Sequence, residues 1–205
     1  NWIEGNNNGL DYASGKGGFY YPDFGNDYIT NNTIIHNSGT GMSLTFSHAN
    51  YITHIKGNNI SHNLGMGILM NDASAGGSTV TDNIVNHNND SGFFGTLSNG
   101  GFIGGLYAIG LQLENNSFEY NNGVGIALPS LTNYGEIPIK NNTVTLNNGS
   151  GILFLSSKDT GPNSIEDNTI CNNQGIGIEL VSLKNGGLSP IARNTIQNNE
   201  GRDTY

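Results

Sequence analysis

The chain has 205 residues, of which 35% are hydrophobic and 11% charged, and its formal net charge at pH 7 is −9. Its seven Lys and Arg side chains form no basic stripe that could neutralise phosphates, so we expect neither nucleic acid nor a membrane as a partner. The 35 Asn and 31 Gly residues make up about a third of the chain, and both types weaken helices. A helix bundle is therefore disfavoured.

A short repeat runs through most of the sequence. Its marker is an Asn that returns at a nearly constant step, at Asn32, Asn58, Asn83, Asn116, Asn142, Asn168 and Asn194. A second Asn stands five positions after each marker, at Asn37, Asn63, Asn88, Asn121, Asn147, Asn173 and Asn199. Apolar residues lie three before and two after the marker, and in six copies a Gly nine positions after it precedes another apolar residue. Each repeat therefore predicts three short strands.

Three strands per repeat, joined by Asn and Gly bends, are typical of a solenoid of parallel strands, because both residue types tolerate a left-handed backbone. We predict an all-β fold, a parallel β-helix solenoid of about eight coils of ~26 residues that forms a single domain over residues 1–205. Successive coils would lie about 4.8 Å apart, so the two Asn columns would become side-chain ladders.

Residues 1–31 fit the repeat less well and predict a degenerate first coil. Ile3 and Asn6 fall at the offsets of the apolar residue before the marker and of the marker itself, but Asn8 replaces a core apolar residue. A loop excursion over residues 14–27 would complete this coil.

The step from Asn83 to Asn116 is the longest, and it exceeds the common step, such as that from Asn116 to Asn142, by seven positions. We place this excess in a loop insertion over residues 95–110, which is rich in Gly and aromatic side chains. Both excursions would leave the same shaft, and loops of this kind often carry function.

Two segments, NNTVTLNNGSGILFL (141–155) and DNTICNNQGIGIEL (167–180), show the repeat most clearly. In these motifs, and over about residues 26–201, the sequence resembles the right-handed parallel β-helix repeats of the pectate-lyase-like superfamily. The resemblance implies a right-handed solenoid, an extracellular or cell-surface location, and carbohydrate binding or polysaccharide processing as a lyase, hydrolase or epimerase. The superfamily's Asp-Pro-His-Glu, Arg-x-Pro-x-x-Arg and Gly-His-Gly signatures do not occur, so catalysis stays open.

Histidine is concentrated in the early repeats, since all five lie between residues 36 and 87. His36, His62 and His87 share the offset four positions after the marker, so we expect an imidazole column. Such a column could share a metal, or supply a general base together with a carboxylate such as Asp90. The alternative is that His replaces Asn in a stack at a bend, because Asn172 and Asn198 occupy the same offset later.

If the excursions flank the early coils, the three imidazoles line the floor between them, and Tyr21 and Asp23 line one wall. The candidate catalytic residues are then His36, His62, His87, Tyr21 and Asp23.

A calcium ion is a further candidate, because acidic side chains supply the oxygen ligands that Ca²⁺ prefers. The candidate ligands are Asp23, Asp27, Asp72 and Asp90. With few cationic side chains in the chain, we expect the substrate to be a neutral polysaccharide, or an acidic one bridged by Ca²⁺.

Glu114, Lys140 and Glu166 share the offset two positions before the marker and alternate in sign. This pattern favours ion pairs between coils on a solvated face over a catalytic pair of carboxylates.

The competing function is a non-catalytic structural segment of an adhesin, tailspike or filament. A solenoid ends in open strand edges, which would support end-to-end or lateral self-association.

Overall fold

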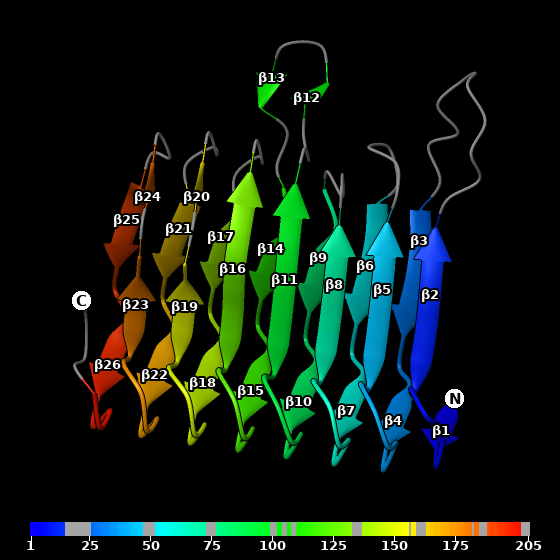
Figure 1. The fold of residues 1–205 in the computed structure, drawn as a ribbon. Helices are drawn as coiled ribbons and strands as arrows, with labels where there is room; N and C mark the ends of the chain where they lie inside the picture. The colour runs from blue at the N-terminus through cyan, green and yellow to red at the C-terminus, as the bar shows by residue number, and fades with distance from the viewer. Residues whose placement is uncertain are drawn as a thin grey trace.

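The computed structural model describes residues 1–14, 26–46, 52–72, 77–98, 102–103, 106–107, 110–132, 137–155, 157–158, 163–181, 183–184 and 188–201. Its elements are β-strands, which the chain visits in a fixed order of three sheets per coil (Figure 1). Within the described part no helix has the length and apolar character needed to span a membrane. The predicted class, an all-β right-handed parallel β-solenoid, is confirmed.

The first sheet, sheet A, has eight short parallel strands, one from each coil, in the order of the chain. Its strands are β1 (Trp2–Glu4), β4 (Thr33–Ile35), β7 (Asn59–Ser61), β10 (Ile84–Asn86), β15 (Ser117–Glu119), β18 (Thr143–Thr145), β22 (Thr169–Cys171) and β26 (Thr195–Gln197). Each strand spans three residues because an Asn bend lies on either side of it.

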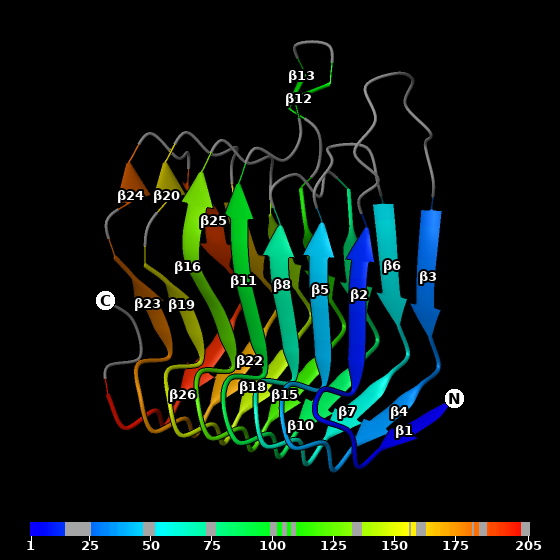
Figure 2. The same ribbon diagram turned by 45° about the vertical axis from the view of Figure 1, so that its right-hand side comes forward.

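Sheet B carries the longer strands on the neighbouring face (Figure 2). Its strands are β2 (Leu10–Ser14), β5 (Met42–Phe46), β8 (Ile68–Asp72), β11 (Phe93–Ser98), β16 (Ile126–Thr132), β19 (Ile152–Phe154) and β23 (Ile178–Leu180), with β20 (Ser157–Lys158) and β24 (Leu183–Lys184) beside them.

Sheet C closes the coil on the third side. Its strands are β3 (Asn26–Thr30), β6 (Ile52–Lys56), β9 (Thr79–Thr81), β14 (Gln112–Glu114), β17 (Pro138–Lys140), β21 (Asn163–Glu166) and β25 (Leu188–Ala192). A separate antiparallel pair, β12 (Phe102–Ile103) with β13 (Leu106–Tyr107), projects beyond the end of β11 (Figures 1 and 2).

The core is a stack of inward side chains from the three sheets. In sheet A the middle residue of each strand points inward, so Ile34, Ile60, Val85, Phe118 and Val144 are fully buried and lie one above the other. Full burial of such a side chain stabilises the fold by about 1.5–3 kcal/mol.

Both Asn columns form continuous ladders at the bends around sheet A, as predicted. Every Asn of the two columns follows a residue with positive φ, a backbone that turns the chain sharply. Asn63 is typical: its N–H and Nδ2 both donate to Oδ1 of Asn88, at 3.1 and 3.0 Å. Its Nδ2 also donates to the Ile34 carbonyl at 3.1 Å, and its Oδ1 accepts from the N–H and Nδ2 of Asn37. The buried amides therefore satisfy each other and the backbone.

The expected register of the first coil was wrong. Ile3 pairs with Ile34, and the Asn6 N–H donates to Oδ1 of Asn37, so Asn6 belongs to the second ladder. Asn1 takes the marker position, because its Nδ2 donates to Oδ1 of Asn32. The error has a simple cause. An apolar residue three positions before a ladder Asn occurs twice in every coil, so Asn6 matches both Asn32 and its true counterpart Asn37.

The two expected excursions lie largely outside the described residues. β2 continues to Ser14 and β3 begins at Asn26, so residues 14, 26 and 27 belong to strands. β11 continues to Ser98, because Leu97 still points into the core with 1% of its surface exposed. Residues 95–98 therefore belong to this strand.

Candidate functional site

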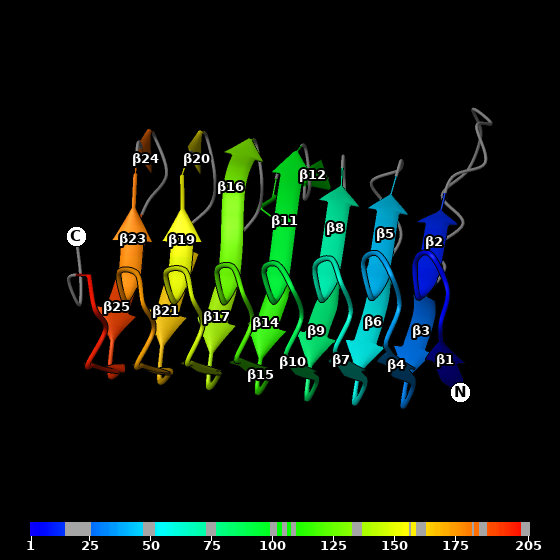
Figure 3. The same cartoon turned by 60° about the horizontal axis from the view of Figure 1, so that its bottom comes forward.

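A row of aromatic side chains crosses four consecutive coils at one bend. The row consists of His36, His62, His87 and Tyr120, and we call it the ring row. All four residues have φ between 54° and 57°, directly after a strand of sheet A. Seen from below, the bends that carry this row line up along the solenoid axis (Figure 3).

The rings stack face to face. The centroids of His36 and His62 lie 5.3 Å apart with planes inclined by 16°, and those of His62 and His87 lie 4.9 Å apart with planes inclined by 3°. Tyr120 continues the stack at 4.9 Å and 11° from His87. The structure therefore brings the three predicted imidazoles together. It adds Tyr120, which stands at the same offset after the marker but carries a phenol in place of an imidazole, so imidazole chemistry alone does not predict it.

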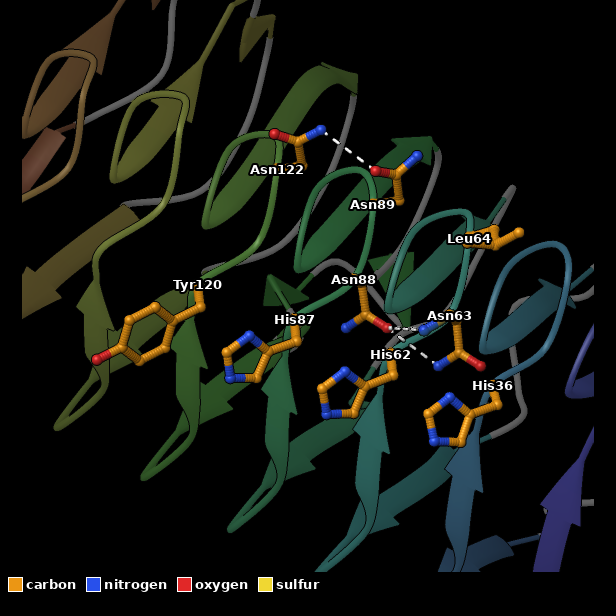
Figure 4. A pocket seen from close by; sticks show the side chains of 9 residues that line it. All are labelled: His36, His62, Asn63, Leu64, His87, Asn88, Asn89, Tyr120 and Asn122. Carbon is orange, nitrogen blue, oxygen red and sulfur yellow. Dashed lines mark hydrogen bonds between the residues drawn. The ribbon is translucent and has the colours of Figure 1, made fainter.

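A groove of about 400 Å³ runs beside the ring row (Figure 4). The ring row forms one wall, and Leu64, Asn89 and Asn122 form the other. The second wall lies two positions further along each coil, and the Asn122 Nδ2 donates to Oδ1 of Asn89 at 3.3 Å.

Two ladder residues, Asn63 and Asn88, lie between the walls as a floor (Figure 4). Each is 1% exposed, and their amides are occupied by the ladder. The floor is therefore rigid, and the ring edges and the outer amides are the groups that can meet a ligand.

The electrostatics of the groove favour the neutral form of the His62 imidazole. Burial lowers the pKa of His62 below its ordinary value of 6.5, and the neighbouring His87 and His36 lower it further by charge repulsion. None of the nine residues that line the groove is a carboxylate. Asp90, the expected partner of a general base, instead accepts hydrogen bonds from the Ser91 N–H at 2.7 Å and the Ser91 hydroxyl at 3.3 Å.

The stack does not form a chelating site for a metal. A histidine binds a metal through a lone pair in the plane of its ring, at about 2 Å. Because the ring planes are nearly parallel and their centroids lie 4.9 to 5.3 Å apart, the lone pairs of neighbouring rings do not converge on one point. Among the described residues, no group of three or more His, Cys, Asp or Glu side chains could hold a metal ion.

Asp27 and Asp90, the remaining sequence candidates whose side chains the structure describes, do not line the groove. Tyr21 and Asp23, expected on one wall, lie outside the described residues, as does the side chain of Asp72. Of the expected calcium ligands, Asp27 accepts a hydrogen bond from the Tyr12 hydroxyl and Asp90 is held by Ser91. Neither carboxylate belongs to a group of three or more metal-ligating side chains among the described residues.

The charged column on sheet C is confirmed in part: Lys140 pairs with Glu166 between coils, whereas no ion pair joins Glu114 to Lys140 among the described residues. Lys140 Nζ lies 3.3 Å from a carboxylate oxygen of Glu166, and Arg193 lies at the same distance from that carboxylate. Arg193 also donates two hydrogen bonds to Asp167, at 2.7 and 2.8 Å, which lower the pKa of the Asp167 carboxyl. This cluster supports the structural interpretation of the column.

Two family models match the chain. The model of the family described as "Periplasmic copper-binding protein (NosD)" matches residues 1–137, and the one described as "Right handed beta helix region" matches residues 105–203. No curated protein and no solved structure matches. The first match contains the whole ring row and its groove, and the two together confirm the resemblance to β-helix repeat proteins.

Proposed function

Since the chain belongs to the NosD family, whose description places its members in the periplasm, we propose that this β-helix protein acts outside the cytoplasm and binds a polysaccharide in the groove beside the ring row. The observation that carries this proposal is the pair of parallel walls.

A linear polymer suits this groove because the walls repeat with the coils. A chain lying along the solenoid axis meets a ring edge on one side and a Leu or Asn side chain on the other, at steps of 4.9 to 5.3 Å. An Asn amide both donates and accepts hydrogen bonds, as a sugar hydroxyl does. Ring nitrogens of neutral imidazole also supply one donor and one acceptor.

The charge of the groove selects among glycans. Its lining contains no carboxylate, Lys or Arg, and the lowered pKa of His62 favours the neutral form of that imidazole. We therefore propose a neutral polysaccharide as the ligand in preference to an acidic one bridged by Ca²⁺.

Copper, which the family description names, does not fit the described residues. Imidazole is a suitable ligand for copper. However, the parallel planes of His36, His62 and His87 direct their lone pairs side by side, and no other cluster of metal ligands lies among the described residues. We accordingly assign copper no part in the binding of the glycan.

Binding without turnover agrees best with the groove. Glycoside hydrolysis usually needs two carboxyl groups that flank the scissile bond. The described groove supplies rings and amides but no carboxyl group.

The proposal is tested with an array of neutral and acidic glycans, probed at pH 7.5 with no added metal, with Ca²⁺ and with Cu²⁺, alongside assays for new reducing ends and unsaturated products. We expect binding of a neutral glycan that needs neither metal and yields no product. Turnover would contradict the assignment as a binding protein. Absence of binding to any glycan would overturn the proposal in favour of the structural segment.

Tyr120→Asn tests whether the groove is the site. Asn suits the positive φ at this position, since Asn172 has φ 58° there, so the fold should survive. Losing an aromatic contact should weaken binding about three- to tenfold, because such contacts contribute ~0.5–1.5 kcal/mol. Leu146→Asn, at the same position one coil further and outside the lining, is the matched control and should bind as wild type. Equal affinities for the two variants would remove the groove as the site.

A further inference from the structure

The two ends of the ring row differ. On the coil after Tyr120 the equivalent position is Leu146, whose side chain is 39% exposed. On the coil before His36 it is Gly5, which has φ +74° and therefore the same kind of bend. A Cβ at Gly5 would have no atom within 4 Å, so the position beside His36 is open. One face of the His36 ring is thus covered by His62, and the other faces a position without a side chain.

We propose that this open position, bounded by His36 and Gly5, is a stacking subsite for the terminal sugar of a glycan held in the groove. The inference rests on the proposed function, and it specifies the position at which the bound glycan ends. Flat ring faces pack well against the apolar C–H face of a sugar ring, which is itself amphipathic.

The spacing of the row matches this occupant. The centroids of neighbouring rings lie 4.9 to 5.3 Å apart, and each coil contributes one ring to the stack. Because Gly5 has no side chain, the place of the next ring, on the coil beside His36, is unfilled. A sugar ring placed there continues the row at its own period, in line with the wall that the row forms along the groove.

Glu4, the residue before Gly5 in the chain, indicates the chemistry of the terminal sugar. Glu4 precedes Gly5 in the chain, is exposed, and accepts a hydrogen bond from the Trp2 indole N–H at 2.8 Å. A carboxylate has two acceptor oxygens, so it suits two adjacent hydroxyl groups and repels an acidic sugar. The expected occupant is the neutral end of a glycan chain that carries two neighbouring free hydroxyls.

Gly5→Asn is the decisive variant. Asn198 has φ 57° at the equivalent position, so Asn can adopt this backbone, and its side chain would fill the open space. The matched control is Gly57→Asn, which makes the same change at another positive φ, on the opposite bend of sheet A, where Asn31 and Asn141 already occur. Both variants should unfold at the wild-type temperature within a few degrees.

The readout is the affinity for short neutral oligosaccharides of the glycan that the array identifies, measured by calorimetry, with the His36 ring signals followed by NMR. We expect Gly5→Asn to weaken binding at least tenfold and to abolish the shift of the His36 signals, and Gly57→Asn to do neither. His36→Asn, which removes the ring face and keeps a residue suited to positive φ, should reproduce the loss.

The outcomes separate the subsite from the groove. If Tyr120→Asn weakens binding while Gly5→Asn and His36→Asn bind as wild type, the groove stands and the subsite is wrong. If Tyr120→Asn also binds as wild type, or no oligosaccharide binds, both proposals fail. Tighter binding of oligosaccharides that end in an acidic sugar would overturn the role of Glu4.

Discussion

Asn147 and Asn148 are neighbours in the chain with opposite environments. Asn147 is fully buried, donates to the Phe118 carbonyl and to Asn173, and accepts two hydrogen bonds from Asn121. Asn148 is exposed and bonds only one side chain, that of Asn122, among the hydrogen bonds of the described residues. Stability at this bend therefore depends on the buried residue.

Asn147→Ala should lower the free energy of unfolding by about 1–3 kcal/mol, because it leaves buried N–H and C=O groups without partners. Asn148→Ala is the control, and we expect a change within ~0.5 kcal/mol, as for most surface substitutions. Urea denaturation at pH 7.5 measures both. Equal midpoints for the two variants would show that the ladder does not stabilise the fold.

The stacked imidazoles make stability depend on pH. The pKa of His62 is lowered in the folded state by burial and by His87 and His36, so the unfolded chain takes up a proton more readily. The free energy of unfolding should then be highest above pH 6.5 and should decrease as the pH falls from 6.5 towards the lowered pKa. Melting temperatures between pH 5.0 and 7.5 should show this slope, and His62→Asn should flatten it. If His62→Asn keeps the full slope of melting temperature against pH, groups other than His62 cause the pH dependence.

At the scale of single elements, the bend between sheets A and B has no room for a side chain. A Cβ at Gly125 would overlap Cγ1 of Val144 and would lie 2.8 Å from the Gly151 carbonyl oxygen, both on the next coil. Gly125→Ala should therefore push two coils apart and lower the free energy of unfolding by about 1–3 kcal/mol, the usual cost of overpacking. Chemical denaturation checks this value. A change as small as that of an ordinary surface substitution would mean that the coils adjust freely.

Strand positions from Asn32 onward could be predicted because two Asn columns and three apolar columns all have to agree on one period. The first coil was misplaced because its few markers match two registers, and only strand pairing such as Ile3 with Ile34 distinguishes them. The imidazole column followed from equal offsets. The groove could not be predicted from the sequence, because its width depends on the distance between two rows of side chains after the bend between them has folded.

At the scale of the whole molecule, each coil pairs with the coil before it and the coil after it, in all three sheets. Stability in such an array is close to a sum of coil terms and interfaces between neighbours. Gly125→Ala therefore acts on one interface, the one with the coil that carries Val144 and Gly151, and its cost should be that of a single weakened interface.

The ladders also give the molecule a direction. In both buried ladders the hydrogen bonds from one Asn amide to the next all run towards the coil that follows, as from Asn32 to Asn58 and from Asn63 to Asn88. Amides aligned in this way polarise one another, so each ladder acts as one extended dipole. The exposed amides of the groove wall run the opposite way, since Asn122 donates back to Asn89. A sugar chain also has two unlike ends, and we expect it to enter this oriented track in one sense only.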